Sequence, residues 1–259
     1  MNISLIGSGN LAFHLAKALH TNGFKILEII ARNEKEGRSL ATLTASTFQN
    51  NFQKINAETD IIFLTVSDSS IQTIAHEIEI GNKLLVHCSG ALALNEIKTA
   101  NNRSAVFYPL QTFSKEKEID FSKIPVFLEA EYHSDLEILK TIAEKITNKV
   151  FVLDSNKRKE IHLSAVLANN FSNHLWYLSS KILKHSGQNF DILKPLLEET
   201  LHKAFELGPF LAQTGPAARN DQKTIENHLK MLENDKNLRN IYQLISASIY
   251  DSKKDISEK

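Results

Sequence analysis

A glycine-rich turn near the amino terminus has residue types suited to holding a phosphate. The turn Gly7–Ala12 (GSGNLA) follows the short β-branched run Ile3–Ile6 and opens a stretch with helical spacing of apolar residues. The first glycine permits a tight turn, the second lets the backbone approach a pyrophosphate, and Ala12 lets the helix pack close to the strand. The free N–H groups and the dipole of such a helix start favour a negative charge. The pattern predicts a dinucleotide site formed by Gly7, Ser8, Gly9, Asn10 and Leu11; the alternative is that the glycines serve packing alone.

The next predicted strand, 24–31, ends at Arg32 and Asn33. An acidic residue at this place would bind the ribose hydroxyls of NAD, whereas a permanently charged guanidinium suits the 2′-phosphate of NADP. We therefore expect NADP(H) as the cofactor, with Arg32 and Asn33 at its ribose. A solvated surface arginine is the alternative.

Three further strand ends carry groups that could line the same crevice, because ligands of open α/β sheets bind beyond the carboxyl ends of the strands. Ser89 could hold a substrate oxygen or cap a turn, and Gln111 and Thr112 could bind substrate or simply close their loop. Cys88 has no neighbour that would activate it, so we expect it to be buried and inert. The candidates are Thr65, Val66 and Ser67 for the cofactor, and Ser89, Gly90, Gln111 and Thr112 for the substrate.

One long helical pattern, 156–184, carries a polar stripe. At 100° per residue its apolar residues fall on one side, which we expect to be core, namely Leu167, Phe171, Leu175, Leu178 and Ile182. The other side carries His162 and Asn169, with Asn170 flanking, and is expected to face the cleft or a partner subunit. His162 is a candidate proton relay, since an imidazole titrates near neutrality; a histidine bonded at an interface is the alternative.

The order of elements that must position these groups changes class near residue 154. Strand-like apolar runs alternate with helical patterns up to that point, which predicts a mostly parallel, doubly wound sheet covered on both faces. All later patterns are helical. We expect a dinucleotide-binding Rossmann domain over residues 1–154 and an all-helical substrate and dimerisation domain over residues 155–259. The predicted strands are 3–6, 24–31, 61–66, 84–87, 105–108, 125–128 and 150–153.

Composition excludes several classes of protein. The 259 residues include 30 basic and 30 acidic side chains, so the formal charge of zero offers no electrostatic attraction to nucleic acid or to an anionic membrane. A single cysteine can form neither an internal disulfide nor a thiolate metal site, and we expect no metal. The first residues lack the basic flank of a signal peptide. We expect a cytoplasmic protein.

Several longer segments resemble a known family. HCSGA, FYPLQTF, LDSNKRKEIHLSAVLANNFSNHLW and AQTGPAARND are similar to those of a bacterial group of predicted NADP-dependent oxidoreductases. Its members resemble 6-phosphogluconate dehydrogenase, the β-hydroxyacid dehydrogenases and pyrroline-5-carboxylate reductase. The resemblance implies a Rossmann domain followed by an all-α domain of the 6-phosphogluconate dehydrogenase C-terminal type.

The resemblance also bears on substrate contacts. The β-hydroxyacid dehydrogenases carry K-x-x-N-N on a helix, and this chain matches the two asparagines with Asn169 and Asn170 but has Val166 in place of the lysine. The usual proton donor is therefore missing, which leaves His162 as the nearest replacement. Related reductases bring a loop like Thr214–Pro216 to a neighbouring subunit's site, where Arg219 could meet an anionic substrate; a plain turn is the alternative.

These features together predict an NADP-dependent oxidoreductase that moves hydride between the nicotinamide and a small carbonyl, imine or alcohol. Ser89, His162 and Asn170 are the candidate catalytic residues. The rival hypothesis is a regulatory or scaffold protein that binds a dinucleotide without turnover, and kinship alone suggests a deazaflavin carrier as a third. We expect a homodimer through the helical domain, around the apolar residues Phe205, Leu207, Phe210 and Leu211.

Overall fold

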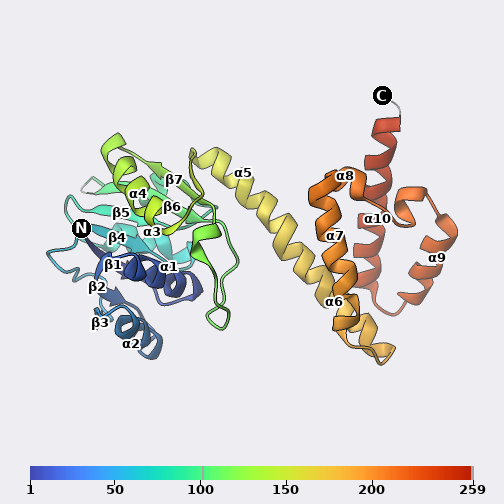
Figure 1. The fold of residues 1–259 in the computed structure, drawn as a ribbon, viewed down its shortest axis with the longest axis horizontal. Coiled ribbons are helices and arrows are strands. Elements are labelled where there is room, and N and C mark those ends of the chain that lie inside the picture. Colours follow the sequence, from blue (N-terminus) through green and yellow to red (C-terminus); the bar gives the residue numbers. More distant parts are fainter. Residues whose placement is uncertain (101, 258–259) are drawn as a thin grey trace. The chain divides into compact units, whose positions relative to one another are not determined.

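The computed structural model describes residues 1–100 and 102–257, with side chains up to residue 254. Two compact units, Met1–Asn169 and Asn170–Lys259, divide the chain. Figure 1 draws the ribbon with its elements labelled. The first unit carries the sheet, and the second contains helices in its described part.

An eight-stranded sheet forms the first unit, in the order β3-β2-β1-β4-β5-β6-β7-β8. Neighbouring strands are parallel except for β6 and β7, which are antiparallel. The order places β1 and β4 at the centre of one half, with their carboxyl ends side by side. The strands are β1 (Asn2–Ile6), β2 (Lys25–Ile30), β3 (Thr47–Gln49), β4 (Ile61–Leu64), β5 (Leu84–His87), β6 (Arg103–Pro109), β7 (Val126–Ala130) and β8 (Val150–Val152).

Helices cover both faces of this sheet. Side chains of α1 (Asn10–Thr21), α2 (Glu34–Leu43) and α4 (His133–Ile146) join one apolar core, while those of α3 (Asp68–Glu77) join a separate one with the short 3₁₀ helix Leu94–Ile97. The two cores lie on opposite faces because successive strand residues point to opposite sides. The predicted mostly parallel, doubly wound sheet is confirmed, as are all seven predicted strands.

The segment that follows β8 is helical but not one uniform α-helix. It consists of α5 (Ser155–Ala165), a π-helical stretch (Val166–Phe171) and α6 (Ser172–His185). A π turn holds more residues than an α turn, so angular positions calculated at 100° per residue do not carry across it. The predicted core stripe was wrong for four of its five residues: Leu178 is buried, but Leu167, Phe171, Leu175 and Ile182 are 37% to 55% exposed.

The remaining helices are α7 (Lys194–Leu207), α8 (Pro209–Ala212), α9 (Gln222–Met231) and α10 (Lys236–Ser257). The polar sequence from Asp251 continues α10 as far as Ser257. None of the described helices combines the length and the apolar composition needed to cross a bilayer.

Candidate functional site

A groove of about 860 Å³ lies at the carboxyl ends of β1, β2 and β4. Eight of the ten residues predicted to bind the cofactor line it, namely Gly7, Ser8, Gly9, Arg32, Asn33, Thr65, Val66 and Ser67. Asn10 and Leu11 are not in its lining and occupy the first turn of α1. The groove has the volume of a small-molecule or cofactor site.

The glycines of the turn have different roles. Gly7 has φ of +129°, and a β-carbon there would lie 2.6 Å from the carbonyl oxygen of Thr65, so only glycine fits. Gly9 is the N-cap of α1 and makes no side-chain capping bond, and a β-carbon there would meet nothing within 4 Å. The start of α1 therefore has no side-chain cap, and the space beside Gly9 is open. This arrangement fits a pyrophosphate, which would accept hydrogen bonds from the first N–H groups of α1.

Charged groups gather where the ribose end of a dinucleotide would lie. Arg32 is exposed at the end of β2, and Asn33 caps α2 by accepting a bond of 3.2 Å from the Glu36 N–H. The Glu36 carboxylate lies 2.9 Å from Lys115 Nζ and accepts a bond of 3.4 Å from Ser8 Oγ. Arg32 thus stays unpaired among the described ion pairs and is available to a phosphate.

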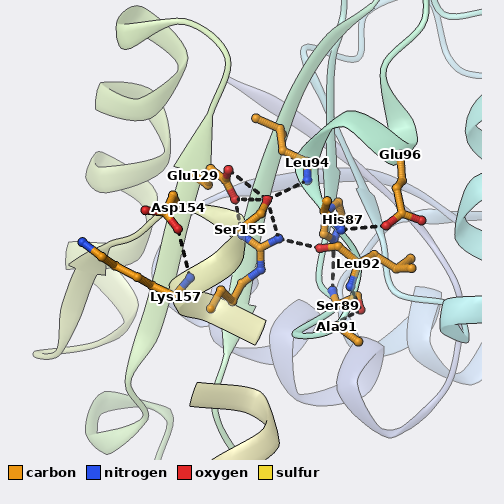
Figure 2. Close-up of polar contacts among 12 residues, drawn as sticks. His87, Ser89, Ala91, Leu92, Leu94, Glu96, Glu129, Asp154, Ser155 and Lys157 are labelled. Atoms are coloured by element: carbon orange, nitrogen blue, oxygen red, sulfur yellow. Dashed lines mark hydrogen bonds and ion pairs between the residues drawn. The ribbon is translucent and has the colours of Figure 1, made fainter. Parts of the chain in front are cut away.

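The turn after β5 uses its polar groups locally (Figure 2). The N–H groups of Ala91 and Leu92 each donate to Ser89 Oγ at 3.1 Å, and the Ser89 N–H donates to His87 Nδ1 at 3.2 Å. Burial, with Arg158 nearby, lowers the pKa of His87 to about 3. Burial also raises the pKa of the Cys88 thiol far above its usual range, in line with an inert cysteine. Ser89 is 4% exposed and caps the turn, as one of its two interpretations expected.

Beside this turn lies a hydrogen-bonded pair from distant parts of the sequence. The hydroxyl of Tyr108, at the end of β6, lies 2.9 Å from Nδ1 of His162 in α5. A β-carbon on Gly90 would lie 2.6 Å from Tyr108 Cζ and 2.7 Å from His162 Nδ1. Gly90 therefore leaves room for the protein's own pair, whereas the sequence suggested room for a ligand. Burial and the charge of Asp68 raise the pKa of Tyr108 to about 12, against a smaller opposing effect of Arg158.

Arg158 fixes the start of α5 against the sheet, one helical turn before His162. Its side chain is 1% exposed and pairs with Glu129 of β7. It also donates to the carbonyl of Leu92 at 2.5 Å. Ser155 donates to Glu129 at 2.8 Å and accepts from the Leu94 N–H at 2.9 Å, so α5, β7 and the turn after β5 are bonded together (Figure 2). Because residues four apart share a helix face, this anchor directs His162 toward Tyr108.

The remaining candidate substrate-binding residues are exposed, and none of them bonds to the Tyr108–His162 pair in the described hydrogen bonds. Gln111 and Thr112 are exposed, and the Gln111 side chain accepts a bond of 2.8 Å from the Thr112 N–H, which closes the loop. Asn169 and Asn170 are exposed in the π-helical stretch, and Arg219 is exposed in the helical unit. Their roles in binding substrate stay predictions.

Two residues of the site were missed in the sequence. Tyr108 was read as the end of an apolar strand, although a phenol placed at a carboxyl strand end could have been flagged. Arg158 stands between two lysines in a polar stretch and looks solvated. Its partner Glu129 lies 29 residues earlier, and no local pattern links them.

Comparison with known proteins agrees with this architecture. A family model described as "NADP oxidoreductase coenzyme F420-dependent" matches residues 2–90, and one for a domain of unknown function, DUF2520, matches residues 124–249. No curated protein sequence matches the chain.

Solved structures match over nearly the whole chain. A candidate NADP oxidoreductase of Bacteroides fragilis, BF3122, is 39% identical with a TM-score of 0.89, covering 96% of this chain and 98% of that one. Protein TM1727 of Thermotoga maritima is 26% identical with a TM-score of 0.80, covering 97% and 99%.

A more distant match shares the fold. The reductive aminase of Aspergillus terreus, solved with NADPH and ethyl levulinate, is 10% identical with a TM-score of 0.74, covering 96% of this chain and 94% of that one. The cofactor expected from the sequence, NADP(H), is that of the family described by the N-terminal model. The chain belongs to the NADP oxidoreductase family in which this N-terminal domain is joined to a DUF2520 domain.

Proposed function

We propose that the protein transfers hydride between NADP(H) and a small carbonyl, imine or alcohol. The observation that carries the proposal is the groove lined by the phosphate-binding turn and Arg32. Gly90 follows β5, and Tyr108 lies near the end of β6, on the same edge of the sheet as the groove; His162 of α5 bonds to Tyr108 and completes a polar cluster there. A reductase needs both a dinucleotide site and polar groups for the substrate heteroatom, placed close together.

Different residues of the chain would bind the cofactor and the substrate. The N–H groups at the start of α1 would hold the pyrophosphate, and Arg32 would pair with the 2′-phosphate. The reduced nicotinamide, when bound, supplies the hydride. Ser89 uses its oxygen to accept two backbone bonds but keeps a hydroxyl proton that it could donate. Asn169, Asn170 and Arg219 are proposed substrate contacts on the grounds of family resemblance.

Nucleotide binding gives the first test. We expect fluorescence titration to show NADPH bound more tightly than NADH, and Arg32→Ala to weaken NADPH binding by about 10- to 100-fold, the value of a charge-assisted hydrogen bond. The matched control is Arg38→Ala, because Arg38 is a cation on α2 that already pairs with Glu34 at 2.7 Å. Equal affinity of the wild type for both nucleotides would remove the NADP assignment.

Turnover gives the second test. NADPH oxidation is measured with a panel of small ketones, aldehydes and cyclic imines, including ethyl levulinate with and without an amine. Oxidation that depends on a panel member supports the proposal. Tight NADPH binding without oxidation across the panel would favour the rival, a dinucleotide-binding regulator or scaffold.

We also propose a homodimer formed through the helical domain. Phe205, Leu207 and Leu211 are 86%, 50% and 70% exposed in the single chain. Neighbouring large apolar side chains exposed to water favour association with a partner. Light scattering at micromolar protein should give twice the chain mass of 29.2 kDa; a monomer mass would refute the proposal.

A further inference from the structure

We propose that Tyr108 is the proton donor of this reductase, and that His162 orients the Tyr108 hydroxyl and reprotonates it after each turnover. The inference rests on the proposed function and assigns the role of the lysine that is absent at Val166. It comes from the contacts of the first unit alone.

Tyr108 lies near the carboxyl end of β6, on the sheet edge that also carries the dinucleotide groove. It is the last residue but one of β6, which pairs with β5, and β5 pairs with β4, whose following residues, Thr65 to Ser67, line the dinucleotide groove. The charge of Asp68 acts on the Tyr108 phenol, and in the sequence Asp68 stands between Ser67 and Ser69, which both line the groove. The phenol and the cofactor groove therefore share one edge of the sheet and one charged neighbour.

The pair is held in one geometry by its surroundings. The ring of Tyr108 stacks on Phe127 at 6.2 Å between centroids and meets the His162 imidazole edge-on at 5.8 Å. The Gly90 backbone lies against both members of the pair. Arg158 fixes α5 one turn before His162. A proton donor held this firmly loses little entropy when substrate arrives.

The hydrogen bond can work in the direction that frees the phenol proton. When His162 carries its proton on Nδ1, that N–H donates to the Tyr108 oxygen, and the phenol O–H is left to donate to a substrate oxygen or nitrogen. Among the described residues none bonds to Nε2 of His162, and the side chain is half-buried, so water can reach that atom. The raised pKa of Tyr108 keeps the phenol protonated at neutral pH.

The step balances in the direction of reduction. NADPH, when bound, would supply the hydride by breaking a C–H bond of its nicotinamide ring; the hydride would form the new C–H bond of the product, and the C=O or C=N π electrons would go to the heteroatom. The Tyr108 O–H bond breaks and its proton forms the new O–H or N–H bond. The Nδ1 proton of His162 moves to the Tyr108 oxygen while Nε2 takes a proton from water, so both residues end neutral. The sum is NADPH, a proton and the unsaturated substrate giving NADP⁺ and the reduced product.

Placement is tested without any substrate, by nuclear magnetic resonance of histidine side chains. The His162 signals are assigned with His162→Ala, and the protein is titrated with NADP⁺ and with 2′,5′-ADP, which lacks the nicotinamide half. We expect NADP⁺ to shift the His162 signals and 2′,5′-ADP to leave them in place, while both shift the amide signals of Gly7 and Gly9. If Gly7 and Gly9 shift with NADP⁺ but His162 does not, the inference is overturned and the proposed function stands. If none of them shifts, the proposed function itself fails.

Proton donation is tested with any panel member that is turned over. Tyr108→Phe should lower kcat about 100-fold or more with little change in KM or NADPH affinity, since a positioned general acid contributes that much. Tyr132→Phe is the matched control, because Tyr132 is 50% exposed. Unchanged kcat in Tyr108→Phe would exclude the phenol as donor.

The role of His162 is tested with variants that separate the orientation of the Tyr108 hydroxyl from its reprotonation. His162→Asn keeps an N–H near the position of Nδ1 but cannot pass a proton through a ring, so its kcat should fall between those of the wild type and His162→Ala, at unchanged KM. Gly90→Ala, whose β-carbon would meet both Tyr108 and His162, should lower kcat while both side chains remain. A raised KM with unchanged kcat in these variants would contradict the assignment, since it would indicate a role in binding only.

Discussion

Removal of Arg158 should loosen the part of the molecule that positions His162. Arg158 is 1% exposed and Glu129 is 17% exposed at the side chain, so their ion pair is largely shielded from water. Breaking such a pair from one side costs about 3 to 5 kcal/mol, because the remaining charge keeps its burial and loses its partner. Glu129 reaches some water and keeps the Ser155 hydroxyl as a donor, which favours the lower end, about 3 kcal/mol.

The variant Arg158→Met tests this value, since methionine fills part of the space of the arginine stem without its charge. Urea unfolding followed by circular dichroism measures the loss in stability, and hydrogen exchange over residues 155–165 shows whether it falls on α5. The neighbouring Lys157→Ala is the control. Lys157 is exposed, so its removal should change stability by less than about 0.5 kcal/mol.

The same variant has a functional consequence that distinguishes anchoring from bulk stability. Below the temperature at which Arg158→Met unfolds, amide hydrogen exchange over α5 should be faster in this variant than in the wild type. Its kcat should be lower, while its affinity for NADPH is retained. The phosphate-binding turn is built from β1 and α1, which Arg158 does not contact in the described bonds. A stability change under about 1 kcal/mol with unchanged exchange over α5 would refute the anchoring role.

Three further outcomes follow from the site. Gly7→Ala should abolish NADPH binding in a fluorescence titration, because φ of +129° and the Thr65 carbonyl at 2.6 Å exclude a β-carbon; retained affinity would show that the turn does not hold the cofactor. Native Cys88 should resist iodoacetamide and react on unfolding, because burial raises its pKa; fast native labelling would contradict this. His87 has a folded pKa of about 3 against an ordinary 6.5, so below pH 6.5 the unfolded state binds the extra proton. The free energy of unfolding should therefore fall by about 2 kcal/mol between pH 7 and pH 5 on account of this residue. A His87→Gln variant with the same pH dependence as the wild type would contradict that assignment.

The sheet could be predicted because most of its strands have a clear local sequence signal. Each of the seven predicted strands is a short apolar run, as expected for strands buried on both faces. The strand β3 (Thr47–Gln49) was missed because it is three residues long and lies at the sheet edge, where a Thr-Phe-Gln sequence needs no apolar run. The phosphate-binding turn could be predicted for a related reason: its contacts are local, and the glycine spacing follows directly from the backbone geometry that the turn needs.

The helical segment could be predicted in extent but not in orientation. The periodicity of 156–184 correctly indicated a helix, and α5 begins one residue earlier with Asp154 as its cap. Four of the five residues expected in the core are at least 37% exposed, and the calculation at 100° per residue also overlooked the π-helical stretch Val166–Phe171. Such a stretch depends on tertiary contacts and ligand sites more than on local propensity, so no single-sequence pattern announced it.

The polar cluster shows why a site built from distant segments escapes local reasoning. Tyr108 and His162 are 54 residues apart, and each has an ordinary local explanation, as a strand end and as one polar position on a helix. What joins them is a position without a side chain: Gly90, which reads in the sequence as space for a ligand, is space for two of the protein's own groups. A glycine at a strand end thus gives the same local signal whether the space beside it holds a ligand or the protein's own side chains. Which of the two fills the space depends on whether another element packs over the glycine. Here that element is α5, held by the buried Arg158, whose partner Glu129 lies on β7.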